Sequence, residues 1–391
     1  MKKVLCFLLV SLFLVPNMVF ASDTEVVNEV SDIAGNAKSA ILIEATTGKI
    51  IYEKNSHEKL APASMTKIMS MLLIIENIDK GVIKWDDKVT VSENASSMGG
   101  SQILLETGEQ MTVYDLFKGI AVASGNDAVV ALSEYVAGSE EEFVRLMNEK
   151  VKELGLKDTV FKNPHGLDTA NHYSSAYDMS IIAKELVKHE KVFEFTSIYE
   201  DYLRKGTKRE LWLVNTNKLV RFNPIVDGLK TGYTKEAGYC LTATAKKNNM
   251  RLISVIMGEP DTKTRNSETT NLLDYGFNKY KAEKVLTKTN VIDKIKIEKA
   301  KNKEISIVPL KDYSVIRGKT EKIGKITYEL KLNDIKLPTK KGKVVGKLII
   351  KEDNKELSKV DVTVKDDIKR ANIIELYGTY LKNILNGNIK F

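Results

Sequence analysis

The strongest constraint in this sequence is a serine and a lysine placed three residues apart at the start of a long apolar segment. Residues Ala61–Lys67 read Ala-Pro-Ala-Ser-Met-Thr-Lys, and an almost entirely apolar run continues to Ile75. Proline favours the first turn of a helix, and helical residues three apart share a face. We therefore expect a helix that places the Ser64 hydroxyl beside the Lys67 amine. The unpaired N–H groups at a helix start favour negative charge, so the pattern is suited to acyl transfer.

The amino terminus is typical of a secretory signal peptide. Lys2 and Lys3 precede an apolar run over 4–15, and Ala21 ends a short small-residue segment. Residues 1–21 are therefore predicted to be an export signal, and residues 22–36 a flexible polar lead-in. An uncleaved anchor is the alternative, although the run is short for a membrane span. Removal of the signal leaves Cys240 alone, which excludes an internal disulfide. Its apolar neighbours predict a buried thiol.

The net charge of +8 is unevenly distributed along the chain. From Lys284 onward there are 26 Lys and Arg against 14 Asp and Glu, whereas the preceding part is slightly acidic once the signal is removed. In an exported protein, a basic carboxyl-terminal part favours an anionic surface such as lipid headgroups or wall polymer. No nucleic-acid fold signature is present, and we expect no nucleic-acid partner.

Residues 37–283 mix strands and helices in an order typical of one antiparallel sheet covered by helices, with an added helical subdomain. The expected strands are 39–44, 49–53, 225–230, 239–245 and 252–257, with an extended stretch at 85–91. The expected helices are those starting near Pro62, then 112–122, 127–136, 141–154, 176–188 and 266–280.

Residues 284–365 change to alternating apolar runs with Lys-rich and Gly-containing turns, which predicts a small all-β domain. Its expected strands are 291–297, 305–308, 326–332, 344–350 and 360–364. Residues 366–391 hold an expected amphipathic helix over 367–385, which is predicted to lie on a membrane surface. Packing of that helix on its own β domain is the alternative.

Two further motifs accompany Ser64 and Lys67. Ser124-Gly125-Asn126 interrupts two helical stretches, and Lys230-Thr231-Gly232 lies at the end of an expected strand. Each is weak alone, since Ser64 could be a helix cap and the lysine of the third motif a surface charge. Together, in this order and these settings, they are far more specific.

With these motifs the chain resembles the low-molecular-mass penicillin-binding proteins that are serine D-alanyl-D-alanine carboxypeptidases. The resemblance runs from about residue 37 to the end and also covers Asp227–Gly232 and Arg265–Leu273. It implies a penicillin-recognising, β-lactamase-like catalytic domain, a β-rich domain and a terminal anchor helix. The implied substrates are peptidoglycan stem peptides ending in D-Ala-D-Ala, with β-lactams as covalent inhibitors, no cofactor and no metal. The expected location is the outer face of the cytoplasmic membrane or the wall.

Roles for single residues follow from this resemblance and from their chemistry. Ser64 is the expected nucleophile and Lys67 its base, made neutral by burial and by the ammonium of Lys230. Ser124 is the expected proton relay, and Asn126 is expected to bind the peptide backbone of the substrate. The resemblance assigns an oxyanion hole to the N–H groups of Ser64 and Tyr233. The terminal carboxylate of the substrate is expected at Thr231 and Arg265, and Gly232 is a further expected substrate-binding residue.

Several alternatives stay open at this level. A β-lactamase shares the first and third motifs, but no Glu-x-x-Leu-Asn segment supplies a deacylating glutamate. A metal-dependent peptidase would have to use His57, His165, His172 or His189, which form no paired helical motif. A D,D-endopeptidase or a transpeptidase would use the same residues as the carboxypeptidase. A catalytically weak penicillin-binding wall protein is the non-enzymatic alternative.

Overall fold

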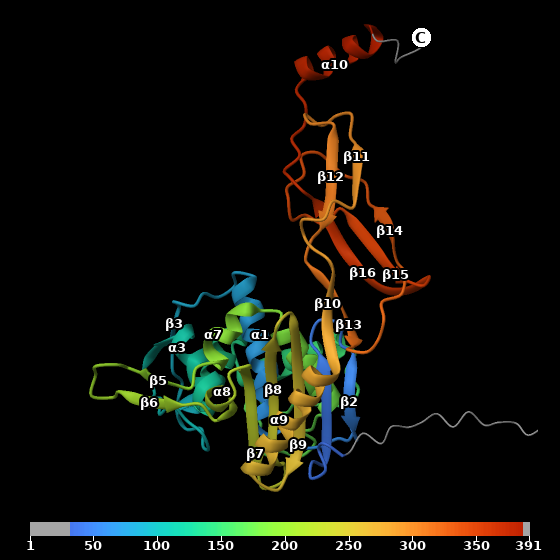
Figure 1. The fold of residues 1–391 in the computed structure, drawn as a ribbon. Helices are drawn as coiled ribbons and strands as arrows, with labels where there is room; N and C mark the ends of the chain where they lie inside the picture. Colours follow the sequence, from blue (N-terminus) through green and yellow to red (C-terminus); the bar gives the residue numbers. More distant parts are fainter. Residues whose placement is uncertain (1–31, 386–391) are drawn as a thin grey trace, which may run out of the picture. The chain divides into compact units, whose positions relative to one another are not determined.

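The computed structural model describes residues 32–385, so the predicted signal peptide and most of the lead-in lie outside the described residues. Its centre is a five-stranded antiparallel sheet in the order β2-β1-β9-β8-β7 (Figure 1). These strands are β1 (Ser39–Glu44), β2 (Ile50–Lys54), β7 (Val226–Thr234), β8 (Gly238–Lys247) and β9 (Met250–Glu259). The expectation that one sheet gathers strands from both ends of the catalytic region is confirmed, because β1 pairs with β9.

The two faces of the sheet bury different residues, as the period of two in a strand requires. Ile41 and Val255 are opposite one another and face the larger core, which also contains α1 (Lys67–Asp79) and α6 (Ala176–Leu186). The alternate positions Leu42 and Leu252 face α9 (Thr262–Lys279), which lies against β8 and β9 (Figure 1). Gly276 allows this contact, since a Cβ there would lie 2.5 Å from Leu252 Cδ1.

Helix α9 begins at Thr262, four residues before the predicted start at Asn266. The physical reason is a helix cap that the apolar pattern does not reveal. The Asp261 side chain accepts hydrogen bonds from the backbone N–H groups of Lys263 and Thr264. Arg265 therefore lies in the first turn of the helix.

The helical subdomain lies between β2 and β7. It contains η1 (Ala63–Thr66), β3 (Lys88–Thr90), α2 (Glu93–Ser96), β4 (Gln110–Thr112), α3 (Val113–Lys118), η2 (Gly119–Ala123), α4 (Asn126–Ala137), α5 (Glu140–Glu153), η3 (Glu190–Val192), α7 (Phe193–Thr196), β5 (Glu200–Leu203), β6 (Leu211–Val214) and α8 (Leu219–Phe222). The extended stretch predicted over 85–91 is shorter, because only 88–90 pair as a strand.

Residues from 280 onward form two further sheets. β10 (Tyr280–Leu286) pairs with β13 (Tyr313–Gly318). The predicted domain limit between residues 283 and 284 falls inside β10. The proposed division into domains stays a prediction. The five-stranded sheet has the order β11-β12-β16-β15-β14, with β11 (Asp293–Lys296), β12 (Glu304–Pro309), β14 (Ile326–Leu332), β15 (Gly346–Glu352) and β16 (Lys355–Val364). The predicted β-rich domain is confirmed.

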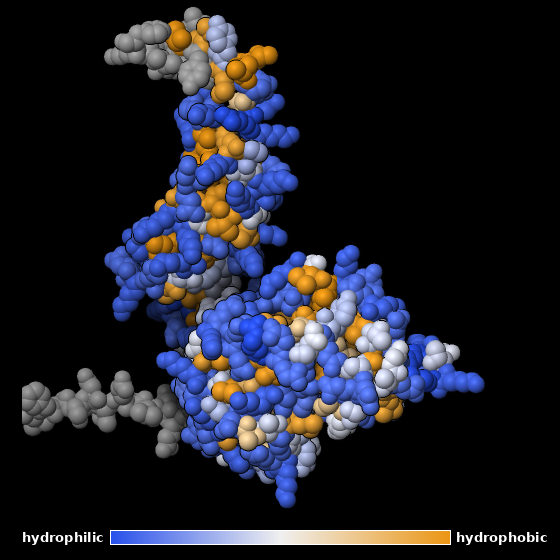
Figure 2. Space-filling view, turned by 180° about the vertical axis from the view of Figure 1, so that it is seen from behind, coloured by the Kyte–Doolittle hydropathy of each residue, from blue (hydrophilic) through white to orange (hydrophobic). Residues whose placement is uncertain are grey.

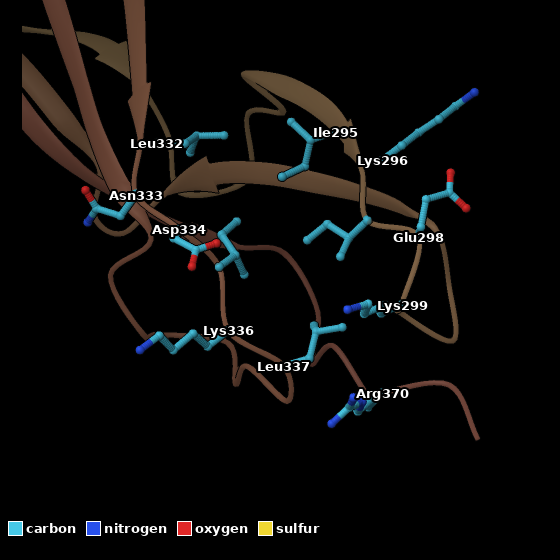
Figure 3. Close-up of a pocket in the computed structure, with 12 residues that line it drawn as sticks. Ile295, Lys296, Glu298, Lys299, Leu332, Asn333, Asp334, Lys336, Leu337 and Arg370 are labelled. Carbon is cyan, nitrogen blue, oxygen red and sulfur yellow. The ribbon is translucent and has the colours of Figure 1, made fainter. Parts of the chain in front are cut away.

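An open cleft of about 630 Å³ lies in this β domain, between the end of β11 and the segment that follows β14. Ile295, Leu332 and Leu337 line it with half-buried apolar side chains, while Lys296 points away from it (Figure 3). Arg370 and Lys299 also line it, so the cleft combines apolar walls with basic groups.

The terminal helix α10 (Ile373–Leu385) starts six residues later than predicted. Ile368 and Arg370 pair with residues of the β domain, so this segment is extended. Asn372 and Glu375 then exchange hydrogen bonds between side chain and backbone N–H, which fixes the helix start. Ile373 and Ile374 are 83% and 78% exposed. Hydrophobic surface is visible at this end of the described chain (Figure 2). Over residues 32–385, no helix combines the length and apolar character needed to span a membrane.

Candidate active site

Ser64 lies in the 3-10 turn Ala63–Thr66, directly before α1. The predicted single helix is therefore two elements, and Lys67 is the first residue of α1. Side chains three apart eclipse one another in a 3-10 turn, which brings the two functional groups together. The Lys67 amine donates a hydrogen bond of 3.0 Å to Ser64 Oγ. The expected pairing of serine and lysine is thus present in the structure.

The turn is fixed from behind by the loop that contains Gly166. A Cβ on Gly166 would lie 1.9 Å from the carbonyl oxygen of Ala63, and this glycine has a φ of +88°. Only glycine fits such a position. Glycine at this position therefore lets the 163–168 loop pack against the backbone that presents Ser64.

Lys67 is completely buried and its amine has three acceptors. Besides Ser64 Oγ, these are Asn126 Oδ1 and the His165 carbonyl, each at 2.7 Å. Burial, followed by the ammonium of Lys230, holds the pKa of Lys67 well below its usual range, while Asp127 opposes the shift. A lysine in this state can lose its proton near neutral pH and act as a base toward Ser64.

Ser124 and Asn126 lie where two helices meet. α3 continues into the π-helix Gly119–Ala123, and Ser124 ends it in a left-handed conformation with φ +65° and ψ +29°. Such π segments are frequent at functional sites. The left-handed residue turns the chain so that Ser124 lines the pocket and Asn126 starts α4. The Asn126 amide also donates to the Gly99 carbonyl at 2.7 Å, so both of its polar atoms are used inside the protein.

The third motif lies on β7, an edge strand of the sheet. Lys230 is 1% exposed and donates to the Thr231 carbonyl at 3.0 Å. Burial and then the nearby Arg265 lower the pKa of Lys230 to about 7. A Cβ on Gly232 would lie only 2.8 Å from the Pro62 carbonyl oxygen, so glycine lets β7 approach the nucleophile turn. Tyr233 is exposed and its ring stacks on Tyr239 at 4.3 Å between centroids.

One pocket of about 410 Å³ brings most of these groups together. Its lining residues are Ser64, Ser101, Ser124, Thr216, Lys218, Thr231, Gly232, Tyr233, Tyr239, Thr262, Arg265 and Asn266. Arg265 is 4% exposed, and its guanidinium donates from Nε and Nη2 to Asn266 Oδ1. Behind this lining, the Lys67 amine donates to Ser64 Oγ and the Asn126 N–H donates to the Ser101 carbonyl at 2.7 Å. The charge of Lys230 interacts with that of Arg265.

Six lining residues were not predicted: Ser101, Thr216, Lys218, Tyr239, Thr262 and Asn266. Thr216 accepts a hydrogen bond of 2.8 Å from the Thr231 hydroxyl, so it fixes a predicted site residue. Ser101 and Thr216 come from loops with no local motif. Tyr239 could have been found from the sequence, because the hairpin of β7 and β8 places it opposite the predicted site residue Tyr233.

The histidines considered as metal ligands have other contacts. His172 Nε2 lies 2.8 Å from the Thr66 hydroxyl, and His172 Nδ1 accepts from the Lys162 N–H. Burial, then the charge of His165, lowers the pKa of His172 to about 4. Within residues 32–385, no three His, Cys, Asp or Glu side chains group in a way that could hold a metal ion. Cys240 is buried, as expected.

Two family profiles match the chain. The one described as D-alanyl-D-alanine carboxypeptidase (peptidase S11) matches residues 25–261, and the one described as the C-terminal domain of penicillin-binding protein 5 matches residues 280–370. D-alanyl-D-alanine carboxypeptidase DacF of Bacillus subtilis is 50% identical over 392 residues, which cover 100% of both chains. D-alanyl-D-alanine carboxypeptidase DacA of Haemophilus influenzae is 35% identical, over 86% of each chain. The solved structure of penicillin binding protein 5 from Haemophilus influenzae has a TM-score of 0.67 at 33% identity, covering 86% of this chain and 98% of that one.

Proposed function

The chain belongs to the D-alanyl-D-alanine carboxypeptidase family and is a serine-type enzyme of this class, and from this premise we propose how its residues perform the reaction. Ser64 Oγ attacks the carbonyl carbon of the penultimate D-Ala, and its proton passes to the neutral amine of Lys67. The observation that carries this assignment is the 3.0 Å contact between Lys67 Nζ and Ser64 Oγ at a fully buried lysine.

The attack converts the carbonyl oxygen to an oxyanion, which the backbone N–H groups of Ser64 and Tyr233 receive. This role is supported by the close approach of β7 to the nucleophile turn at Gly232. Donors fixed before the reaction stabilise such charge more than water does, because they need no reorganisation. Collapse of the intermediate breaks the peptide bond and leaves an ester on Ser64.

The departing D-Ala amine takes a proton that originates from Lys67 and passes through the Ser124 hydroxyl. Ser124 lines the same pocket as Ser64, which supports the relay. Water then attacks the ester, Lys67 accepts one of its protons, and Ser64 is regenerated. Asn126 holds the Lys67 amine at 2.7 Å, and we propose that it also contacts the peptide backbone of the bound substrate.

The terminal carboxylate of the substrate is assigned to Arg265 and Thr231, with Lys230 adding positive charge behind them. Within residues 32–385, the buried Arg265 guanidinium donates hydrogen bonds only to Asn266, from Nε and Nη2, so it retains donors for a carboxylate. The substrate class is therefore peptidoglycan stem peptides with a free D-Ala end, and β-lactams, whose ring carbonyl Ser64 attacks, are the covalent inhibitors.

The test is D-Ala release from a pentapeptide ending in D-Ala-D-Ala, compared between the wild type and Ser64→Ala. We expect release only by the wild type, and a β-lactam mass adduct only on the peptide that contains Ser64. Wild-type protein that releases no D-Ala would refute the assignment. Nitrocefin should acylate the enzyme and be turned over slowly, and rapid turnover would instead indicate a β-lactamase.

We also propose that α10 holds the exported enzyme at the outer face of the cytoplasmic membrane. Support comes from the exposed Ile373, Ile374 and Tyr377 and from the basic groups of the β domain. Truncation after Asn372 keeps the β-domain bridge made by Arg370 and removes the helix together with the six residues that follow it in the sequence. The full chain should cosediment with anionic vesicles and the truncated chain should not. Equal binding of the two proteins would contradict the anchor.

A further inference from the structure

The hairpin formed by β5 and β6 carries two exposed aromatic side chains that the mechanism does not use. Tyr202 and Trp212 are directly opposite one another in the register of the two strands, so both side chains lie on the same face of the hairpin. They are 39% and 56% exposed. The hairpin projects from the helical subdomain (Figure 1). Together the two side chains form an aromatic face beside the catalytic region.

The opposite face of the hairpin is packed against the protein. Leu203 and Leu213 are buried there. The amine of Lys118, on α3, donates to the Asp201 carboxylate at 2.9 Å and to the Tyr202 carbonyl at 3.1 Å. The aromatic face is therefore presented by a fixed pair of strands, and removal of an aromatic ring from it leaves the packed face intact.

The aromatic face continues into the active-site pocket. Positions 213, 215 and 217 are buried, whereas positions 212, 214, 216 and 218 are partly or fully exposed, an alternation typical of extended chain. Trp212, Thr216 and Lys218 therefore follow one row, and the last two line the pocket that contains Ser64. Extended chain spans the four residues from Trp212 to Thr216 in at most about 14 Å. A substrate that extends beyond the pocket on this side meets the aromatic face.

A second pocket-lining segment also contacts the hairpin. Arg204 Nη1 donates to the Ile103 carbonyl at 3.0 Å, and Arg209 Nη2 donates to the Leu104 carbonyl at 2.7 Å. Ser101, two residues before Ile103, lines the pocket. The hairpin thus rests on one wall of the pocket and continues into another, which fixes the aromatic face relative to the site.

The chemistry of the aromatic face fits a sugar chain. Across residues 32–385, neither ring stacks on another aromatic side chain and the Trp212 N–H makes no hydrogen bond, so both rings are available to a ligand. An aromatic ring buries the C–H face of a pyranose, while a Tyr O–H or Trp N–H can bond to the polar groups at the sugar's edge. Lys205 and Lys208 add positive charge in the turn between the strands, which suits the carboxylates of stem peptides.

We propose that the aromatic face binds a glycan strand of peptidoglycan beside the pocket, with sugar rings packed on Tyr202 and Trp212. The inference rests on the proposed function, which supplies the polymer whose stem peptides enter the pocket. Binding at this face holds the enzyme on the polymer and raises the local concentration of stems at Ser64. A free pentapeptide contains no sugar, so its hydrolysis does not depend on the aromatic face.

The first test measures cosedimentation with purified insoluble peptidoglycan in Ser64→Ala protein, which cannot alter the polymer. Trp212→Ala, Trp212→Phe and Tyr328→Ala are each added to this background. Tyr328, on β14, is 46% exposed and supplies a matched control outside the hairpin. Trp212→Ala should weaken binding about tenfold and Trp212→Phe less than about threefold. The control should bind as the parent does.

The second test measures D-Ala release in proteins that retain Ser64. Trp212→Ala should raise KM for polymeric peptidoglycan about tenfold, with kcat and the hydrolysis of a free pentapeptide unchanged within about twofold. A merely structural role would instead lower the pentapeptide activity and the number of sites titrated by benzylpenicillin.

The third test uses Trp212 itself as a probe, since the chain has only two tryptophans. A tetramer of N-acetylglucosamine should change the fluorescence of the Ser64→Ala protein saturably. Trp212→Phe retains Trp85 and should abolish the change.

Unchanged peptidoglycan binding and polymer KM in Trp212→Ala would overturn the proposal. Loss of binding to lipid vesicles with intact peptidoglycan binding would assign the aromatic face to a membrane and overturn it equally. Wild-type protein that releases no D-Ala would refute the proposed function, and cosedimentation of the Ser64→Ala proteins would still decide whether the aromatic face binds glycan.

Discussion

Gly232→Ala is the substitution whose effect on this enzyme can be worked most directly from distances. The new Cβ would lie 2.8 Å from the Pro62 carbonyl oxygen and 3.1 Å from Ala63 Cβ. Ordinary van der Waals contact begins near 3.4 Å, so β7 or the nucleophile turn must move by several tenths of an ångström. The obstructing atoms include backbone, which cannot turn aside as a flexible side chain can.

This movement should cost both stability and rate. Overpacking of a core typically destabilises by about 1–3 kcal/mol, which lowers Tm by roughly 2–10 °C in a domain of this size. Misplacement by about 1 Å can cost a hundredfold in rate, so a smaller shift of Ser64 against β7 should lower kcat/KM by about ten- to a hundredfold.

The assays for Gly232→Ala are thermal unfolding and the second-order rate constant of acylation by a β-lactam. Gly378→Ala is the matched control, because nothing lies within 4 Å of a Cβ built at Gly378. We expect the control to match the wild type in both assays. If Gly232→Ala also keeps the wild-type Tm and acylation rate, then close approach of β7 to the nucleophile turn is not what builds the oxyanion site.

Three further outcomes are expected. Lys230→Met removes a positive charge near Lys67, so the pKa of Lys67 should rise toward its usual value. The acid limb of the pH profile of the acylation rate should then move to higher pH. An unmoved limb would mean that burial alone lowers the pKa of Lys67. Arg265→Ala should lower kcat/KM at least about a hundredfold for a peptide with a free carboxylate and only slightly for its amide, and equal losses would contradict carboxylate binding. Asp127→Ala should destabilise by about 3 kcal/mol, measured by urea unfolding, because this buried carboxylate accepts three backbone N–H groups.

The sequence was sufficient for those parts of the fold that local chemistry determines. Strand β1 has the predicted bounds, and Lys67 lies on a helix and Lys230 on a strand, as expected. Two predicted helix starts were wrong, because α9 begins at Thr262 and not at Asn266, and α10 begins at Ile373 and not at Asp367. The observed starts depend on caps by Asp261 and Asn372, which are readable as sequence signals once capping is considered.

Other features could not be predicted because they depend on tertiary contacts. The short hairpin of β5 and β6 has too few residues to show a period of two. Ser101 and Thr216 reach the pocket only through the paths of their loops. Glu259 and Glu268 are buried at a strand end and on a helix, and neither residue stands out in its own segment.

The left-handed backbone at Ser124 has a consequence for how this enzyme can be improved. A residue with a Cβ loses about 1–2 kcal/mol in that conformation, and glycine would recover most of it. A screen that rewards heat resistance alone should therefore collect glycine at position 124, with a gain in Tm and the loss of the hydroxyl that lines the pocket. At position 124, thermal stability therefore favours glycine, whereas catalysis requires serine.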